Sequence, residues 1–168
     1  MRLFTVLLLA VSAAFAVPAF AAGRSVDVPH KFRALVPKVE KKSGLSVRLP
    51  SAVRVYFRRT YATAFATRRT YRLDLGAARG CNGATACFIA SFAGTRGGKP
   101  AVRRTVQLTR GITGYFKPVT CGASCSPAFV QWKEERVLYE ISYKGASSRR
   151  EKATMVALAN SAIRGGDR

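Results

Sequence analysis

The chain has 168 residues, and its 29 Lys and Arg residues against 8 Asp and Glu give a formal net charge of +21. This length predicts one domain with a core large enough to fold alone. Beyond the N-terminus no apolar stretch approaches the length that crosses a bilayer as a helix. The charge indicates an attraction to polyanions.

The first 21 residues have the pattern of a secretory signal peptide. A positive Met1-Arg2 precedes an almost purely apolar segment, residues 3–16, and Ala19-Phe20-Ala21 supplies the small residues that a signal peptidase requires. The apolar segment is too short to span a bilayer. The alternative is a retained N-terminal anchor.

We therefore expect cleavage near Ala21, a signal peptide at 1–21 and a single secreted α+β domain at 22–168. Loss of Arg2 lowers the net charge of +21 by one, to +20. No cysteine follows the apolar segment until Cys81, so the lipid attachment of bacterial lipoproteins is not available. The expected location is secreted or periplasmic, with no transmembrane segment in the mature chain.

The first elements of the domain are short. Residues 23–31 form a polar lead-in, and Pro37 interrupts the helical spacing of the apolar residues around it because it lacks an N–H. A short helix from Pro37 to Gly44 is predicted. The alternation of Leu45, Val47 and Leu49 with polar residues then predicts a strand.

Several strands follow along the chain. Tyr71, Leu73 and Leu75 alternate with Arg72 and Asp74, which predicts a strand with one solvated face. Gly and Pro predict a turn at 94–100. The other strands are expected within 52–70 and at 87–92, 106–108, 112–117, 129–132 and 137–143, the last two joined by a charged turn at 133–136.

The C-terminus predicts a helix. Ser148 and Glu151 have the spacing of a capping box, and Gly165-Gly166 ends the segment. Between them one apolar stripe comprises Met155, Leu158, Ala159, Ala162 and Ile163. Because such a stripe needs a sheet to cover, the predicted class is α+β: an antiparallel meander of about six to eight strands with the C-terminal helix packed on one face.

Four cysteines in an exported chain predict disulfides. They form two tight clusters, so of three pairings we favour Cys81–Cys87 and Cys121–Cys125. A four-thiolate zinc site and a redox pair are the alternatives. The five-residue spacing is wider than usual for zinc, and neither cluster is a C-x-x-C motif.

No catalytic constellation stands out. His30 is the single histidine and has no nucleophile motif beside it, and Glu134-Glu135 occupies an expected turn. The Gly-rich segment ending in Lys99-Pro100 lacks the Ser or Thr of a P-loop. We expect no catalytic residue, no metal and no cofactor.

One pattern favours binding: arginines interleaved with the aromatic residues of 54–72. Arginine forks pair with phosphate or carboxylate, and aromatic rings between them can stack on sugars or bases. The alternative is a half-buried strand with a solvated face. The candidate anion-binding residues are Arg54, Arg58, Arg59, Arg68, Arg69 and Arg72.

The segment 71–163 carries a resemblance. Cys121-Gly-Ala-Ser-Cys125, then Trp132, Tyr139-Glu-Ile-Ser-Tyr143 and a terminal helix, resembles small exported bacterial proteins of unknown function with paired cysteines before a Trp hairpin. The hairpin and helix are also similar to sheet domains attached to anti-sigma factors and to lipoprotein-carrier-like folds. The resemblance implies export and fold, and no activity.

The functional expectation is a non-enzymatic exported protein that meets anionic envelope components through an Arg-rich face. Its partners would be anionic lipid, lipopolysaccharide, acidic polysaccharide or nucleic acid. One alternative is a structural or accessory envelope domain whose Arg-rich composition reflects only a GC-rich genome. The other is an extracellular enzyme acting on a polyanion.

Overall fold

The computed structural model describes residues 23–81 and 84–166. The expected signal peptide and its cleavage near Ala21 lie outside the described residues. No helix in the described part is both long and apolar enough to cross a membrane.

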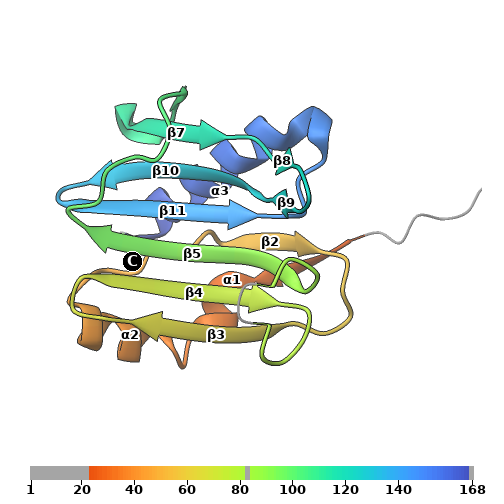
Figure 1. The fold of residues 1–168 in the computed structure, drawn as a ribbon. Helices are drawn as coiled ribbons and strands as arrows, with labels where there is room; N and C mark the ends of the chain where they lie inside the picture. The colour runs from red at the N-terminus through yellow and green to blue at the C-terminus, as the bar shows by residue number, and fades with distance from the viewer. Residues whose placement is uncertain (1–22, 82–83, 167–168) are drawn as a thin grey trace, which may run out of the picture.

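The main sheet has seven strands (Figure 1). These are β3 (Tyr61–Ala66), β4 (Thr70–Gly76), β5 (Phe88–Arg96), β6 (Thr105–Gln107), β7 (Thr113–Lys117), β10 (Ala128–Glu134) and β11 (Val137–Tyr143). Two further pairs of strands are β1 (Arg24–Asp27) with β2 (Ala52–Val55), and β8 (Thr120–Cys121) with β9 (Cys125–Ser126). The helices are α1 (Val28–Phe32), α2 (Val36–Ser43) and α3 (Glu151–Gly165), with 3₁₀ turns at Thr109–Gly111 and Ser148–Arg150.

The predicted antiparallel α+β class is confirmed. The strand order is β3-β4-β5-β11-β10-β7-β6, and every neighbouring pair is antiparallel. The strands β3, β4 and β5 form one half of the sheet, and β6, β7, β10 and β11 form the other. After β5 the chain crosses to the far edge, where β6 lies, and returns strand by strand until β11 pairs with β5. Residue Ser142 lies opposite Ser91 at this junction.

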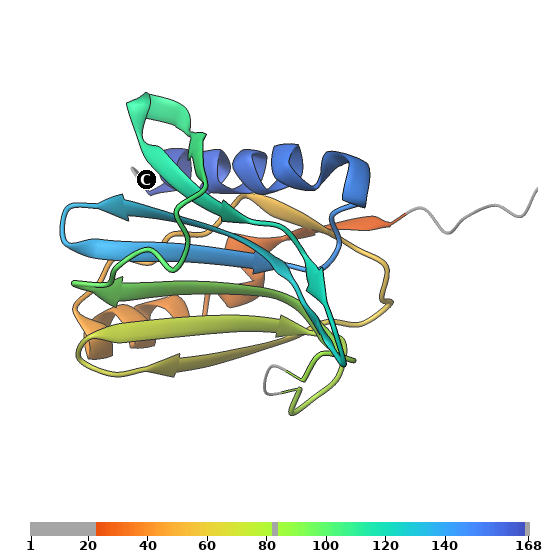
Figure 2. The same cartoon turned by 45° about the horizontal axis from the view of Figure 1, so that its top comes forward.

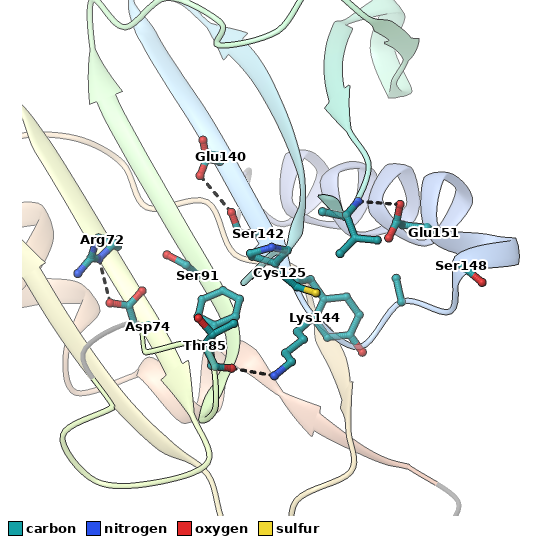
Figure 3. A pocket seen from close by; sticks show the side chains of 16 residues that line it. Arg72, Asp74, Thr85, Ser91, Cys125, Glu140, Ser142, Lys144, Ser148 and Glu151 are labelled. Carbon is teal, nitrogen blue, oxygen red and sulfur yellow. Dashed lines mark hydrogen bonds and ion pairs between the residues drawn. The ribbon is translucent and has the colours of Figure 1, made fainter. Parts of the chain in front are cut away.

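The helices and the β1–β2 pair cover one face of the sheet, with α3 on β10 and β11 and α2 on β3 and β4 (Figures 1 and 2). The core lies between these layers. Phe32 of α1 meets Phe92 of β5 edge to face at 5.8 Å between ring centres, and Trp132 and Met155 are fully buried. The opposite face of the sheet, here the open face, carries Arg72, Asp74, Ser91 and Glu140 (Figure 3).

The predicted strand at Leu45–Leu49 is wrong. Residues 44–50 have no regular structure, and side chains take the place of a strand partner. The N–H of Val47 donates to Glu40 Oε1 at 2.9 Å, and that of Arg48 donates to the Tyr71 hydroxyl at 3.1 Å. The alternation arises because this segment packs its apolar side chains inward without joining a sheet.

The expected polar lead-in is also wrong, because residues 23–31 contain β1 and most of α1. Asp27 caps α1 by accepting the His30 N–H at 2.9 Å, and Val28 is fully buried. By contrast, the helix expected from Pro37 is confirmed as α2, and Gly44 follows it in the left-handed conformation that favours glycine.

The turn predicted at 94–100 starts three residues later, at Gly97, because β5 continues to Arg96. Gly94 is in the strand for a steric reason. The ring of Tyr71 lies directly against it, and a Cβ at this position would overlap the ring. The glycine that suggests a turn in the sequence therefore marks a close approach between β4 and β5.

At the C-terminus the apolar stripe is confirmed, since all five of its residues are buried in α3. The capping box is wrong. Ser148 lies in a 3₁₀ turn, and the carboxylate of Glu151 accepts the N–H of Val119 at 3.1 Å. Glu151 is 8% exposed, so a buried tertiary partner replaces the local cap. The predicted disulfides Cys81–Cys87 and Cys121–Cys125 are both formed.

Candidate functional site

The structure separates the six candidate arginines. Arg58 and Arg59 precede β3 and Arg68 and Arg69 follow it, so roughly 20 Å of strand lies between the two pairs. Arg72 lies on the open face, where its Nε is 2.9 Å from Asp74 Oδ2. Arg54 lies on β2, in the opposite layer. They do not form one cluster.

Two of them belong to a concave site that the sequence does not reveal. A hollow of about 570 Å³ lies where β1, α1 and the segments before β3 and after β4 meet. Its basic lining residues, here the cationic hollow, are Arg24, Lys31, Arg58, Arg59 and Arg79.

Backbone pairing brings these side chains together. Arg24 lies opposite Val55 in the β1–β2 pair, and its Nε donates to the Phe57 carbonyl at 3.1 Å. This bond holds the segment that carries Arg58 against β1. From the other side, the Arg79 guanidinium lies over the Tyr61 ring, 5.5 Å from its centre.

The hollow has a large excess of positive charge, with five basic residues against one carboxylate. Asp27 is the one carboxylate in its lining, and its Oδ1 accepts the His30 N–H. Lys31, Arg58 and Arg59 have no hydrogen-bond or ion-pair partner among the described residues. Like charges gathered without partners repel one another, and an anion relieves that repulsion.

Most of the other described carboxylates make contacts within the fold. Between described residues, ion pairs form only at Arg48–Glu134 and Arg72–Asp74. Glu140 accepts from the Gln131 amide at 2.6 Å and from the Ser142 hydroxyl. The carboxylates thus satisfy buried donors and leave most of the basic surface without counter-charge.

Sequence reasoning missed Arg24, Lys31 and Arg79. Arg24 and Lys31 belong to residues 23–31, for which the sequence predicts only a polar lead-in, and Arg79 precedes the first cysteine cluster. Only the pairing of β1 with β2 and the position of Arg79 after β4 bring them beside Arg58. The one sequence signal is the excess of basic residues itself.

A second groove of about 510 Å³ lies on the open face between the two disulfide loops (Figure 3). Thr85 of one loop and Cys125 of the other line it. Its polar groups are paired internally: Lys144 Nζ donates to the Thr85 carbonyl at 2.7 Å, and Arg72 pairs with Asp74. Three carboxylates, those of Asp74, Glu140 and Glu151, line this groove against two cations, so it offers no preference for an anion.

The polar groups buried in the core serve the fold. Burial raises the pKa values of Tyr71, Tyr139 and Tyr143 above the ordinary 10.0, so these phenols keep their protons. Tyr139 and Tyr143 donate to the carbonyls of Ser46 and Arg54. In the part of the chain that the structure describes, no three His, Cys, Asp or Glu side chains are placed to hold a metal ion.

No protein-family model, no curated protein and no solved structure matches this chain.

Proposed function

We propose that this protein is a non-enzymatic exported protein that binds anionic components of the cell envelope through the cationic hollow. One observation carries the proposal: five basic side chains surround a concave site that has a single carboxylate, Asp27, in its lining. Two disulfides agree with an oxidising compartment outside the cytoplasm.

The chemistry of the hollow favours phosphate, sulfate or carboxylate groups. Arginine presents a planar fork of donors that matches such anions, and four of the five basic residues are arginine. Tyr56 and Phe57, which directly precede Arg58 in the chain, are 62% and 42% exposed and offer aromatic surface to the sugar or acyl portion of a ligand. Lipopolysaccharide, anionic lipid, acidic polysaccharide and nucleic acid all carry these groups.

The test compares two triple variants of equal charge. The first replaces Arg58, Arg59 and Arg79 with Gln, and the second replaces Arg68, Arg69 and Arg136, which are exposed at the other end of the sheet strands. Binding to heparin, lipopolysaccharide and DNA is measured at low and physiological salt, with circular dichroism confirming that both variants fold.

We expect the first variant to lose at least about tenfold more affinity than the second, the equivalent of one charge-assisted hydrogen bond. Equal losses would contradict the proposal and favour a structural or accessory domain with diffuse charge. Product analysis after incubation with each ligand tests the remaining alternative, an enzyme acting on a polyanion.

A further inference from the structure

A separate cleft lies on the other side of α1 from the cationic hollow. His30 and Lys31 line the hollow, whereas Pro29 and Arg33 line this cleft of about 490 Å³. Its volume is within the range of small-molecule sites, about 300–1,000 Å³. It lies between the α1–α2 part of the helical layer and the C-terminal end of α3.

The wall of this cleft is apolar. Val36, Val47 and Leu49 pack against the core on one side and keep part of their surface exposed on the other. Two prolines extend the apolar surface. A hydrocarbon chain lying here would remove this surface from water, which is favourable.

The far wall is held in place by hydroxyl groups. The N–H of Ser51 donates to Ser161 Oγ at 2.9 Å, and the two hydroxyl oxygens are 3.0 Å apart. These bonds fasten the last turns of α3 to the segment after Leu49. The cleft is therefore bounded by two elements that are tied together, and its two serine side chains already pair with each other.

The charge of the cleft has one sign. Arg33 and Arg164 line it, no carboxylate does, and neither guanidinium has a hydrogen-bond or ion-pair partner among the described residues. An apolar surface beside two unpaired guanidinium groups is complementary to a molecule with an anionic head and a hydrocarbon tail.

We propose that this cleft binds an anionic amphiphile, with its carboxylate or phosphate head at Arg33 and Arg164 and its acyl chain along Val36, Val47 and Leu49. This site is distinct from the cationic hollow and its occupation does not depend on the proposed function. The feature that the cleft recognises would be a single acyl chain, which a polysaccharide or a nucleic acid lacks.

The experiment is calorimetric titration of the purified, disulfide-bonded protein with dodecanoate below its critical micelle concentration. Dodecyl phosphate tests the other head group. Dodecyl maltoside has the same chain with an uncharged head, and butanoate has the same head with almost no chain. Methyl NMR resonances of Val36, Val47 and Leu49 report the location.

Two variants probe the cleft. Arg33→Gln with Arg164→Gln removes the charges, and Gly165→Phe fills the space at a position where a Cβ would meet the Leu49 carbonyl oxygen at 3.4 Å. Arg103→Gln with Arg149→Gln is the control of equal charge, since both residues are exposed and outside the cleft.

We expect both dodecyl anions to bind and the three methyl groups to shift. The Arg33 and Arg164 replacement should weaken binding roughly tenfold for each arginine, Gly165→Phe should abolish it, and the control should match the parent. Failure of dodecanoate to bind, or equal binding of dodecyl maltoside, would overturn the inference. The inference would also be overturned if the variant lacking Arg58, Arg59 and Arg79, and not the Arg33 and Arg164 variant, lost dodecanoate binding. That result would leave the proposed function intact.

Discussion

Trp132 Nε1 donates to Glu134 Oε1 at 2.8 Å, and the other oxygen of the same carboxylate lies 2.8 Å from Arg48 Nη2. Trp132 and Glu134 are two residues apart on β10, so they share its core-facing side. Arg48 also lies over the ring of Tyr139, which stacks on Trp132 at 5.6 Å between ring centres. One carboxylate thereby fastens the irregular segment 44–50 to the sheet.

Replacement of Glu134 should therefore destabilise the domain. Glu134→Gln removes a charge from a pair whose side chains are 15% and 18% exposed, leaving the Arg48 guanidinium without its counter-charge. We expect the free energy of unfolding to fall by about 2 kcal/mol, measured by urea denaturation. Glu135→Gln, in the exposed turn next to it, is the control and should change stability by less than about 0.5 kcal/mol.

The contact of Gly94 with Tyr71 predicts a steric effect. Gly94→Ala places a methyl group against a fully buried ring and should cost about 1–3 kcal/mol of stability. Gly122→Ala, at a position with nothing within 4 Å, is the control. In a Tyr71→Leu background the Gly94 substitution should cost less, and an equal cost in both backgrounds would show that the ring is not the obstacle.

The two disulfides should make modest contributions. The loops they close are short, with sequence separations of six and four residues, so replacing either pair by serine should cost about 2 kcal/mol. Peptide mapping without reduction should give Cys81–Cys87 and Cys121–Cys125. Bound zinc, or a bond between the clusters, would contradict this arrangement.

The buried tyrosines predict a loss of stability in alkali. Their folded-state pKa values are raised above 10.0 by burial, so the stabilisation is complete below pH 10 and is lost as the pH rises towards the folded-state values. The free energy of unfolding should fall by up to about 1.4 kcal/mol per pH unit for each tyrosine above pH 10. Tyr71→Phe should reduce this slope, and an unchanged slope would rule out Tyr71 as a source.

The cationic hollow predicts a specific salt dependence. Binding of arginine to the phosphates of DNA releases counterions, so affinity should fall steeply as salt concentration rises. Removing Arg58, Arg59 and Arg79 should lower the slope of log affinity against log salt by roughly 2–3, since each phosphate that an arginine neutralises adds about 0.9 to it. A slope equal to that of the parent would place the DNA-binding residues elsewhere on the surface.

Much of the fold could be predicted because its determinants are close together in the chain. Tyr71, Leu73 and Leu75 alternate with solvated residues because one face of β4 is buried, and that period is visible in any sequence window. The apolar stripe of α3 and both disulfides could be predicted for the same reason, because the residues that form each of them are close together in the sequence. The errors at Leu45–Leu49 and Ser148 occurred where distant partners, Tyr71 and Val119, replaced local hydrogen bonds.

Local patterns along the chain are enough to predict the class of the domain and its pairing of cysteines, and the composition gives its excess of positive charge. The places where that charge gathers depend instead on tertiary contacts. Arg24 joins Arg58 because β1 pairs with β2, and the chain after β4 brings Arg79 to the same hollow. Arg33 lines the same cleft as Arg164 because α3 returns to the start of the domain. Such sites depend on contacts between residues far apart in sequence, which no local period or motif encodes.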